Sequence, residues 1–140
     1  MKVERLHHVG IPVHDMRRAE QFYTGVLGFQ PCVGKANWLW AGDDYSVHLM
    51  PALTPGGPYQ PARHFAFEVE RLEDVAARLL RHGCRPYQMT GDQAQRRDIT
   101  SAEDSLDFGI GTIFVEDPDG NTLEFLESSR GIFAEILDDK

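Results

Sequence analysis

The sequence predicts an α+β fold made of two modules, each with the order strand, helix and three strands. Two observations lead to this prediction. A strand-like run begins near residue 6 and again near residue 63, and an amphipathic helix and three short strand-like runs follow each of them. His8 and His64, 56 residues apart, each stand early in the first strand of a module. A repeat of this length indicates a repeated architecture.

The first module is predicted to cover residues 1–53 and opens with the run "LHHVGIPV" at residues 6–13. Successive side chains of a strand point to opposite faces. The branched apolar residues therefore share the packing face, as Val9, Ile11 and Val13. His8 falls on the other face, where Gly10 and Pro12 leave open space beside it.

A helix is expected next, from an N-cap at Asp15 to a C-cap at Gly28. Three short strand-like runs follow it, at residues 30–34, 36–42 and 45–52. Residues 54–62 hold four consecutive Pro and Gly residues and a further Pro, so we interpret them as a linker.

The second module, residues 63–127, repeats the pattern with a strand, a helix that ends at Gly83, and three more strands. An insertion at about 91–109 interrupts it, and the "DPDG" turn at residues 117–120 joins its last two strands. Residues 128–140 are expected to form a short C-terminal helical tail with an apolar stripe. We expect all these parts to make one structural domain.

Charge and composition exclude several classes of protein. The net charge is −8 without any cluster of Lys and Arg, which argues against nucleic acid as a partner. No apolar run is long enough to span a membrane, and the N-terminus lacks the apolar core of a signal peptide. Cys32 and Cys84 form no metal-binding or disulfide pattern, so we expect a cytoplasmic protein with two reduced thiols.

Four side chains that can bind metal fall on the strand face away from the helices: His8, His48, His64 and Glu124. Each alone would be an ordinary polar residue on the exposed face of a sheet. The repeat places them in the first and last strands of both modules, so together they predict a bound divalent transition metal, such as iron, manganese, nickel, cobalt or zinc. Three histidines are not predicted as ligands. His7 falls on the packing face of its strand, His14 lies in a turn and His82 lies at the end of a helix.

The segments "LHHVGIPVHDMRRAEQFYTGVLGF" and "FVEDPDGNTLEFLE" resemble the opening and closing motifs of the vicinal oxygen chelate superfamily. That superfamily includes glyoxalase I, extradiol dioxygenases, methylmalonyl-CoA epimerase and the fosfomycin- and bleomycin-resistance proteins. The resemblance implies an eight-stranded, curled, mixed-sheet cup in which the first and last strands of each module are neighbours. It also implies that His8, His64 and Glu124 match the common ligand set, with His48 at the fourth position.

The chain departs from the residue patterns of the named members. Pro12 replaces the arginine by which glyoxalase I holds glutathione, and Gly10 replaces a threonine of the fosfomycin thiol transferases. Phe114 stands where extradiol dioxygenases carry a tyrosine. The resemblance therefore predicts the fold without selecting one of these activities.

Two functions of different classes follow. One is a metal-dependent enzyme, of isomerase, lyase or dioxygenase type, acting on a small oxygenated substrate chelated to the metal, with Glu124 as the base and Glu68 as a weaker candidate. The alternative is a metal-free protein of the bleomycin-resistance type that sequesters a small drug-like molecule. The side chains expected to contact the small molecule are Trp38, Trp40 and Phe114.

Two further expectations concern the surface. We expect a homodimer, because a short chain leaves sheet edges to cover. Arg96, Arg97 and Asp98 lie in the insertion, where they either meet an anionic substrate or, as we favour, are solvated.

Overall fold

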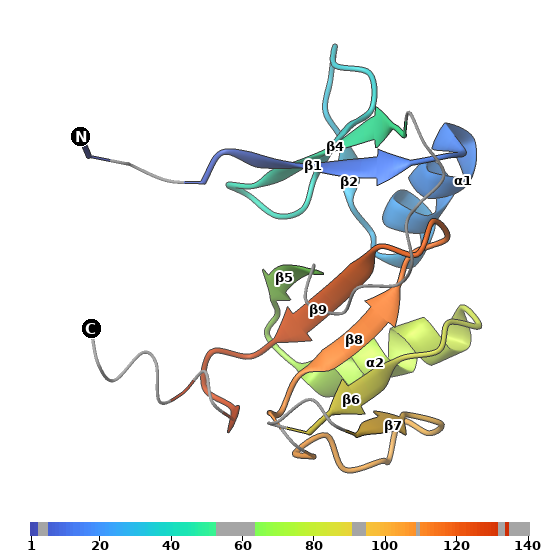
Figure 1. Ribbon diagram of the computed structural model, residues 1–140, viewed down its shortest axis with the longest axis vertical. Helices are drawn as coiled ribbons and strands as arrows, with labels where there is room; N and C mark the ends of the chain where they lie inside the picture. Colours follow the sequence, from blue (N-terminus) through green and yellow to red (C-terminus); the bar gives the residue numbers. More distant parts are fainter. Residues whose placement is uncertain (3–5, 53–63, 91–94, 109, 132–133, 135–140) are drawn as a thin grey trace. The chain divides into compact units, whose positions relative to one another are not determined.

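The computed structural model describes residues 1–2, 6–52, 64–90, 95–108, 110–131 and 134 (Figure 1). The chain divides into two compact units. Unit 1 comprises Met1–Tyr59 and Asp117–Asn121, and unit 2 comprises Gln60–Glu116 and Thr122–Lys140. The predicted linker and most of the predicted tail helix lie outside the described residues. In the described part of the chain, no helix has the length and apolar character needed to cross a membrane.

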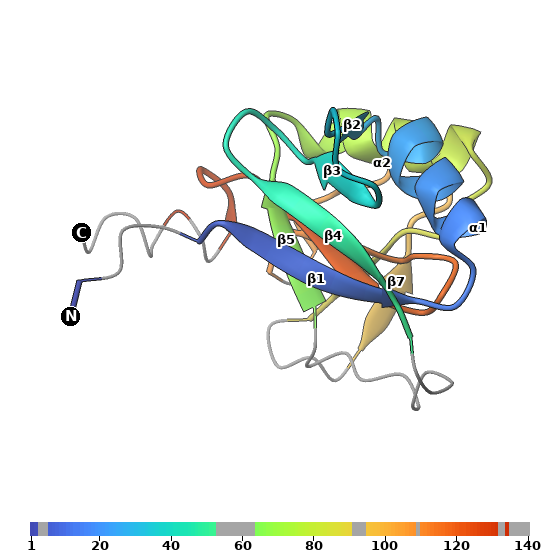
Figure 2. The same cartoon turned by 90° about the horizontal axis from the view of Figure 1, so that it is seen from above.

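Unit 1 contains a four-stranded sheet with the strand order β1-β4-β3-β2. Its elements are β1 (His8–Val13), α1 (Met16–Gln21), the π-helix η1 (Phe22–Val26), β2 (Gln30–Pro31), β3 (Trp38–Trp40) and β4 (Ser46–Pro51). β1 and β4 are parallel and run side by side in both views (Figure 1 and Figure 2), while the other pairs are antiparallel. The first and last strands of this module are therefore neighbours, as the family resemblance implied.

The alternation of side chains in β1 is confirmed. Ile11 and Val13 are buried, whereas His8, Gly10 and Pro12 are exposed. Val47 and Leu49 of β4 and Leu39 of β3 are buried with them. One face of the sheet thus packs into the core of unit 1, and the predicted ligand side chains lie on the other face.

The predicted helix begins as expected, because the Asp15 side chain accepts a hydrogen bond from the backbone N–H of Arg18 at 3.0 Å. Its second half departs from the α-helical geometry and forms η1. There the Thr24 hydroxyl donates to the backbone carbonyl of Glu20 at 2.6 Å, a local bond of the kind that bends helices. Gly28 then adopts a positive φ of 80° and ends the segment.

Unit 2 contains a five-stranded sheet with the order β5-β9-β8-β6-β7 and the helix α2 (Figure 1). Its elements are β5 (His64–Glu68), α2 (Leu72–Arg81), β6 (Tyr87–Met89), β7 (Arg96–Asp98), β8 (Ile113–Glu116) and β9 (Thr122–Leu126). The first strand, β5, again pairs in parallel with the last, β9. Apart from one additional strand, β7, the order of elements in unit 2 repeats that of unit 1, which confirms the predicted pair of modules.

The short strand β7 was not expected, since it lies inside the predicted insertion. Charged residues are depleted in strands, so the sequence pattern gives no sign of it. The Arg96 guanidinium lies 3.8 Å from the centre of the Tyr87 ring and donates from Nε to Asp98 at 2.9 Å. Arg97 lies over the Phe108 ring at 4.8 Å. These side chains make contacts within unit 2, while the Arg96 and Asp98 side chains remain 42% and 65% exposed to solvent.

Candidate functional site

The four predicted ligands lie as two pairs, one in each unit. In unit 1, His8 begins β1 and His48 lies midway along the neighbouring β4. His48 stands opposite Gly10 in the β1–β4 register, and its ring centre is 6.4 Å from that of His8. The two imidazoles thus occupy adjacent places on this face of the sheet.

Trp38 contacts both imidazoles of unit 1. It is the cross-strand partner of His48 in the β3–β4 ladder and stacks on that ring with centres 4.4 Å apart and planes at 20°. Its centre is also 4.5 Å from that of His8. The Lys35 ammonium lies 4.9 Å from the centre of the same indole. The sequence predicted Trp38 on this face but not its contact with the histidines.

In unit 2, His64 and Glu124 lie within hydrogen-bonding distance, with 3.0 Å between His64 Nε2 and Glu124 Oε2. The Glu124 side chain is only 4% exposed, while that of His64 is 33% exposed. Burial raises the pKa of the Glu124 carboxyl, and the adjacent Thr112 and His64 side chains act in the opposite direction. The predicted base is therefore a buried carboxylate that reaches an imidazole.

The residues expected to contact the small molecule differ in exposure. Trp40 is 45% exposed, and Trp38 is half-buried. Phe114 is buried: it stacks on Tyr87 with centres 5.6 Å apart, and it meets the His64 ring edge-on at 6.0 Å. Of the three, Trp40 presents the most ring surface.

The two remaining carboxylates near the predicted site have different surroundings. Glu116 accepts a hydrogen bond from the Tyr87 hydroxyl at 2.7 Å, a structural contact beside the turn. Glu68 is exposed at the last position of β5. Neither has the buried contact with an imidazole that Glu124 has.

The chemistry of the two pairs fits a divalent transition metal, because imidazole nitrogen and carboxylate oxygen are the ligands such ions take in mixed sites. The close approach of His64 Nε2 to Glu124 Oε2 brings two potential ligand atoms together in unit 2. Over the described residues, however, no group of three or more His, Cys, Asp or Glu side chains is arranged to hold an ion. The ligand set therefore stands as two pairs.

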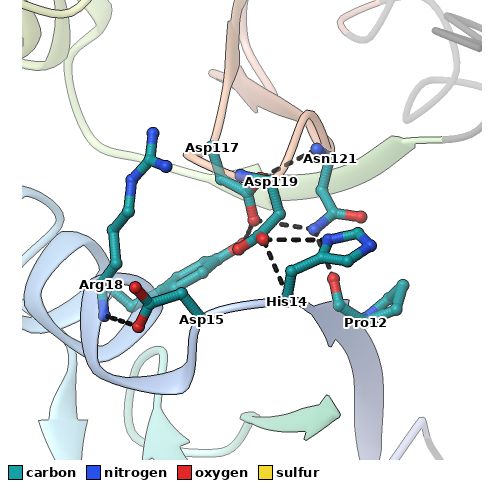
Figure 3. Close-up of polar contacts among 8 residues, drawn as sticks. Pro12, His14, Asp15, Arg18, Asp117, Asp119 and Asn121 are labelled. Carbon is teal, nitrogen blue, oxygen red and sulfur yellow. Dashed lines mark hydrogen bonds and ion pairs between the residues drawn. The ribbon is translucent and has the colours of Figure 1, made fainter. Parts of the chain in front are cut away.

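A second polar cluster, which sequence reasoning missed, surrounds the turn after β8 (Figure 3). The Asp117 carboxylate is buried and accepts hydrogen bonds from the Tyr23 hydroxyl at 2.7 Å and the Asn121 amide at 2.8 Å. It also accepts from the backbone N–H groups of Asp119 and Asn121, both at 2.8 Å. All these residues belong to unit 1, although Tyr23 and Asp117 are 94 positions apart in sequence.

The same turn also contacts the end of β1. The Asn121 amide donates to the backbone carbonyl of Pro12 at 2.9 Å, and Asp119 Oδ1 accepts from the backbone N–H of His14 at 2.8 Å (Figure 3). Burial raises the pKa of Asp117, and burial together with the Asp117 charge raises the pKa of Tyr23 well above its usual value. The "DPDG" motif was the available signal, but it predicts only the turn itself.

Comparison with known proteins identifies the family. The model of the "Glyoxalase/Bleomycin resistance protein/Dioxygenase superfamily" matches residues 5–125. A search of the curated proteins gave no match.

Three solved structures illustrate the similarity of fold. The integron cassette protein HFX_CASS4, from the mobile metagenome of the Halifax Harbour sewage outfall, is 23% identical over 89% of this chain and 99% of its own, with a TM-score of 0.62. Oxidase ChaP-H2 is 19% identical over 90% and 94%, with a TM-score of 0.61. TnmS3, an antibiotic binding protein from Streptomyces sp. CB03234, is 20% identical over 91% and 98%, with a TM-score of 0.59. The chain, with nearly its whole length matched by the family model, belongs to the glyoxalase/bleomycin resistance protein/dioxygenase superfamily.

Proposed function

We propose that this protein is a metal-dependent enzyme that acts on a small oxygenated molecule chelated to a divalent transition metal. The observation that supports this most is the contact between His64 and buried Glu124, an imidazole and a carboxylate with potential ligand atoms 3.0 Å apart. A protein that only sequesters a ligand has no need of such a pair. The proposed ligand set adds His8 and His48, supplied by the same chain or by a second copy.

The roles of the side chains follow from their chemistry. A metal bound by these residues would polarise adjacent oxygens of the substrate and favour an enolate or similar anion. Glu124 is the proposed base, because it is the only carboxylate among the four ligand positions and a base must reach the reacting proton. Trp38, Trp40 and Phe114 are proposed to border the organic part of the substrate, leaving the chelating oxygens for the ion.

Elemental analysis of the protein as purified tests the metal directly. We expect about one equivalent of a transition metal per proposed site, and loss of it in His64→Ala and Glu124→Ala, because removing one ligand lowers affinity by orders of magnitude. His82→Ala is the matched control, since His82 is an exposed residue that caps the C-terminal end of α2 and is not one of the proposed ligands. Equal metal content in all four proteins would place the site elsewhere.

The proposed base has a separate test. For a substrate turned over by the parent, Glu124→Gln with metal retained should still bind substrate and lose turnover by about two to four orders of magnitude, the usual contribution of a general base. Full activity of that variant would reduce Glu124 to a ligand and assign the base to another group.

We also propose a homodimer. β1 and β5 each lie at an edge of the sheet of their unit, and edge strands present backbone groups that another chain can pair with. Sedimentation equilibrium at micromolar concentration should give twice the chain mass of 15.8 kDa. A mass equal to one chain would refute the dimer.

One observation favours the alternative function, metal-free sequestration of a small drug-like molecule. Trp40 and Met50 are large apolar side chains, 45% and 44% exposed, on the face of unit 1 away from the helix. Aromatic and methionine side chains suit flat organic ligands, and a neighbour of similar fold is an antibiotic binding protein. Absence of metal from the purified protein, together with unchanged ligand binding in Glu124→Ala, would favour this function.

A further inference from the structure

We infer that Trp38 and His7 are positioning residues that hold the imidazoles of His8 and His48 in one arrangement. The inference rests on the proposed function, since it concerns two of the proposed metal ligands. It gives Trp38 a second role and adds His7, which was not predicted as a ligand because its side chain falls on the packing face of the strand.

The Trp38 ring contacts the imidazole rings of both His8 and His48. Its indole stacks on the His48 ring at 4.4 Å and 20°, and it contacts the His8 ring at 4.5 Å and 55°. The backbone fixes the contact between Trp38 and His48, because these residues are direct cross-strand partners in β3 and β4. Cross-strand aromatic pairs of this kind restrict side-chain rotation on the face of a sheet. Trp38 thus limits the rotamers of both histidines.

His7 acts on the orientation of the His8 ring. The Nδ1 atoms of the two residues are 3.0 Å apart, and their rings meet edge to face with centres 5.2 Å apart. In such a contact one Nδ1 donates and the other accepts. When Nδ1 of His8 is the donor, the neutral ring of His8 keeps the lone pair of Nε2 for a ligand. Histidines that bind metal usually have their second ring nitrogen held in this way, and loss of the outer partner costs about 10- to 100-fold in metal affinity.

The pieces form one row of rings, from His7 through His8 and Trp38 to His48. Exposed histidines sample several rotamers, and fixing them on metal binding costs conformational entropy. When each ring contacts the next, the rotamers of the histidines are already restricted in the folded protein, so metal binding loses less conformational entropy. The expected consequence is tighter metal binding without any ligand contributed by His7 or Trp38 themselves.

The arrangement can be tested first in metal-free protein. Long-range ¹H–¹⁵N spectra of the six imidazoles should show ring protons of His8 and His48 shifted upfield by the Trp38 ring current, relative to those of exposed His82. Trp38→Leu should remove these shifts and Trp38→Phe should keep part of them. Trp40→Leu, on the same strand but paired with Ser46, should leave them unchanged. His7→Ala should convert a single His8 tautomer into an averaged signal.

Titration with Co²⁺ alone then measures the effect on affinity, with circular dichroism confirming that each variant is folded. Trp38→Leu and His7→Ala should each bind Co²⁺ about 10- to 100-fold more weakly than the parent, and Trp40→Leu should bind it equally well. Parent-like affinity in the first two variants, or spectra in which His8 and His48 resemble His82, would overturn the positioning role. A parent that shows the ring-current shifts and binds no Co²⁺ would instead refute the proposed metal-dependent function while the arrangement of rings stands.

Discussion

Replacing Tyr23 by Phe removes a single oxygen atom from the interior of unit 1. Tyr23 is 0% exposed, and its hydroxyl donates to the buried Asp117 carboxylate at 2.7 Å. A hydrogen bond to a charged group contributes about 1.5–3 kcal/mol net. The carboxylate keeps its other three donors in the variant, so we expect a loss of about 2 kcal/mol. At about 4 °C per kcal/mol for a chain of this size, the melting temperature should fall by about 8 °C.

Urea denaturation followed by circular dichroism measures this loss. Tyr45→Phe is the control, because Tyr45 is 53% exposed and an exposed hydroxyl should change stability by less than about 0.5 kcal/mol. A double-mutant cycle with Asp117→Asn should return most of the loss as coupling between the two residues. If Tyr23→Phe is no less stable than Tyr45→Phe, the hydrogen bond between Tyr23 and Asp117 does not stabilise the turn that Figure 3 shows.

Three further predictions concern the same measurements. Because the raised pKa of Tyr23 keeps its proton on the folded chain while the unfolded chain releases it near pH 10, parental stability should fall above pH 10. The fall should be about 1.4 kcal/mol per pH unit, and urea melts should show the gap to Tyr23→Phe narrowing over that range. Gly131→Ala should cost about 3 kcal/mol by urea denaturation, because φ is 59° and the added Cβ would overlap the Ile110 carbonyl. Gly34→Ala, with φ of 74° and open space, should cost about 1 kcal/mol. Arg130→Gln breaks ion pairs with three carboxylates and should cost about 1 kcal/mol, a difference that 1 M NaCl should reduce.

The first strands of the two units illustrate what local sequence determines. Burial of Ile11 and Val13 and exposure of His8 follow from alternation alone, since a strand turns successive side chains to opposite faces. The caps at Asp15 and Gly83 are equally local, because each depends on the backbone conformation of a few residues. The presence of Glu124 and the histidines on the faces away from the helices could therefore be predicted without a structure.

The surroundings of those residues could not be predicted in this way. Whether Glu124 is buried, and whether its oxygen meets the imidazole of His64, depends on how β5 pairs with β9 and on what covers them. The contact of Trp38 with two histidines likewise needs the register of three strands. Register between distant segments is set by packing and turn geometry over the whole sheet. It therefore cannot be predicted from the local pattern of a single sequence.

By itself the sequence determined the α+β class, the repeated module, the family motifs and the strand faces of the candidate ligands, because each of these is a pattern among neighbouring residues. Only the tertiary structure decided the π-helical turn at Phe22–Val26, the strand at Arg96–Asp98, and the cluster that brings Asp117 to Tyr23. These features depend on contacts between residues far apart in the chain. Such contacts form only when burial of apolar surface has brought the segments together, and a buried carboxylate then takes whichever donors that packing places beside it.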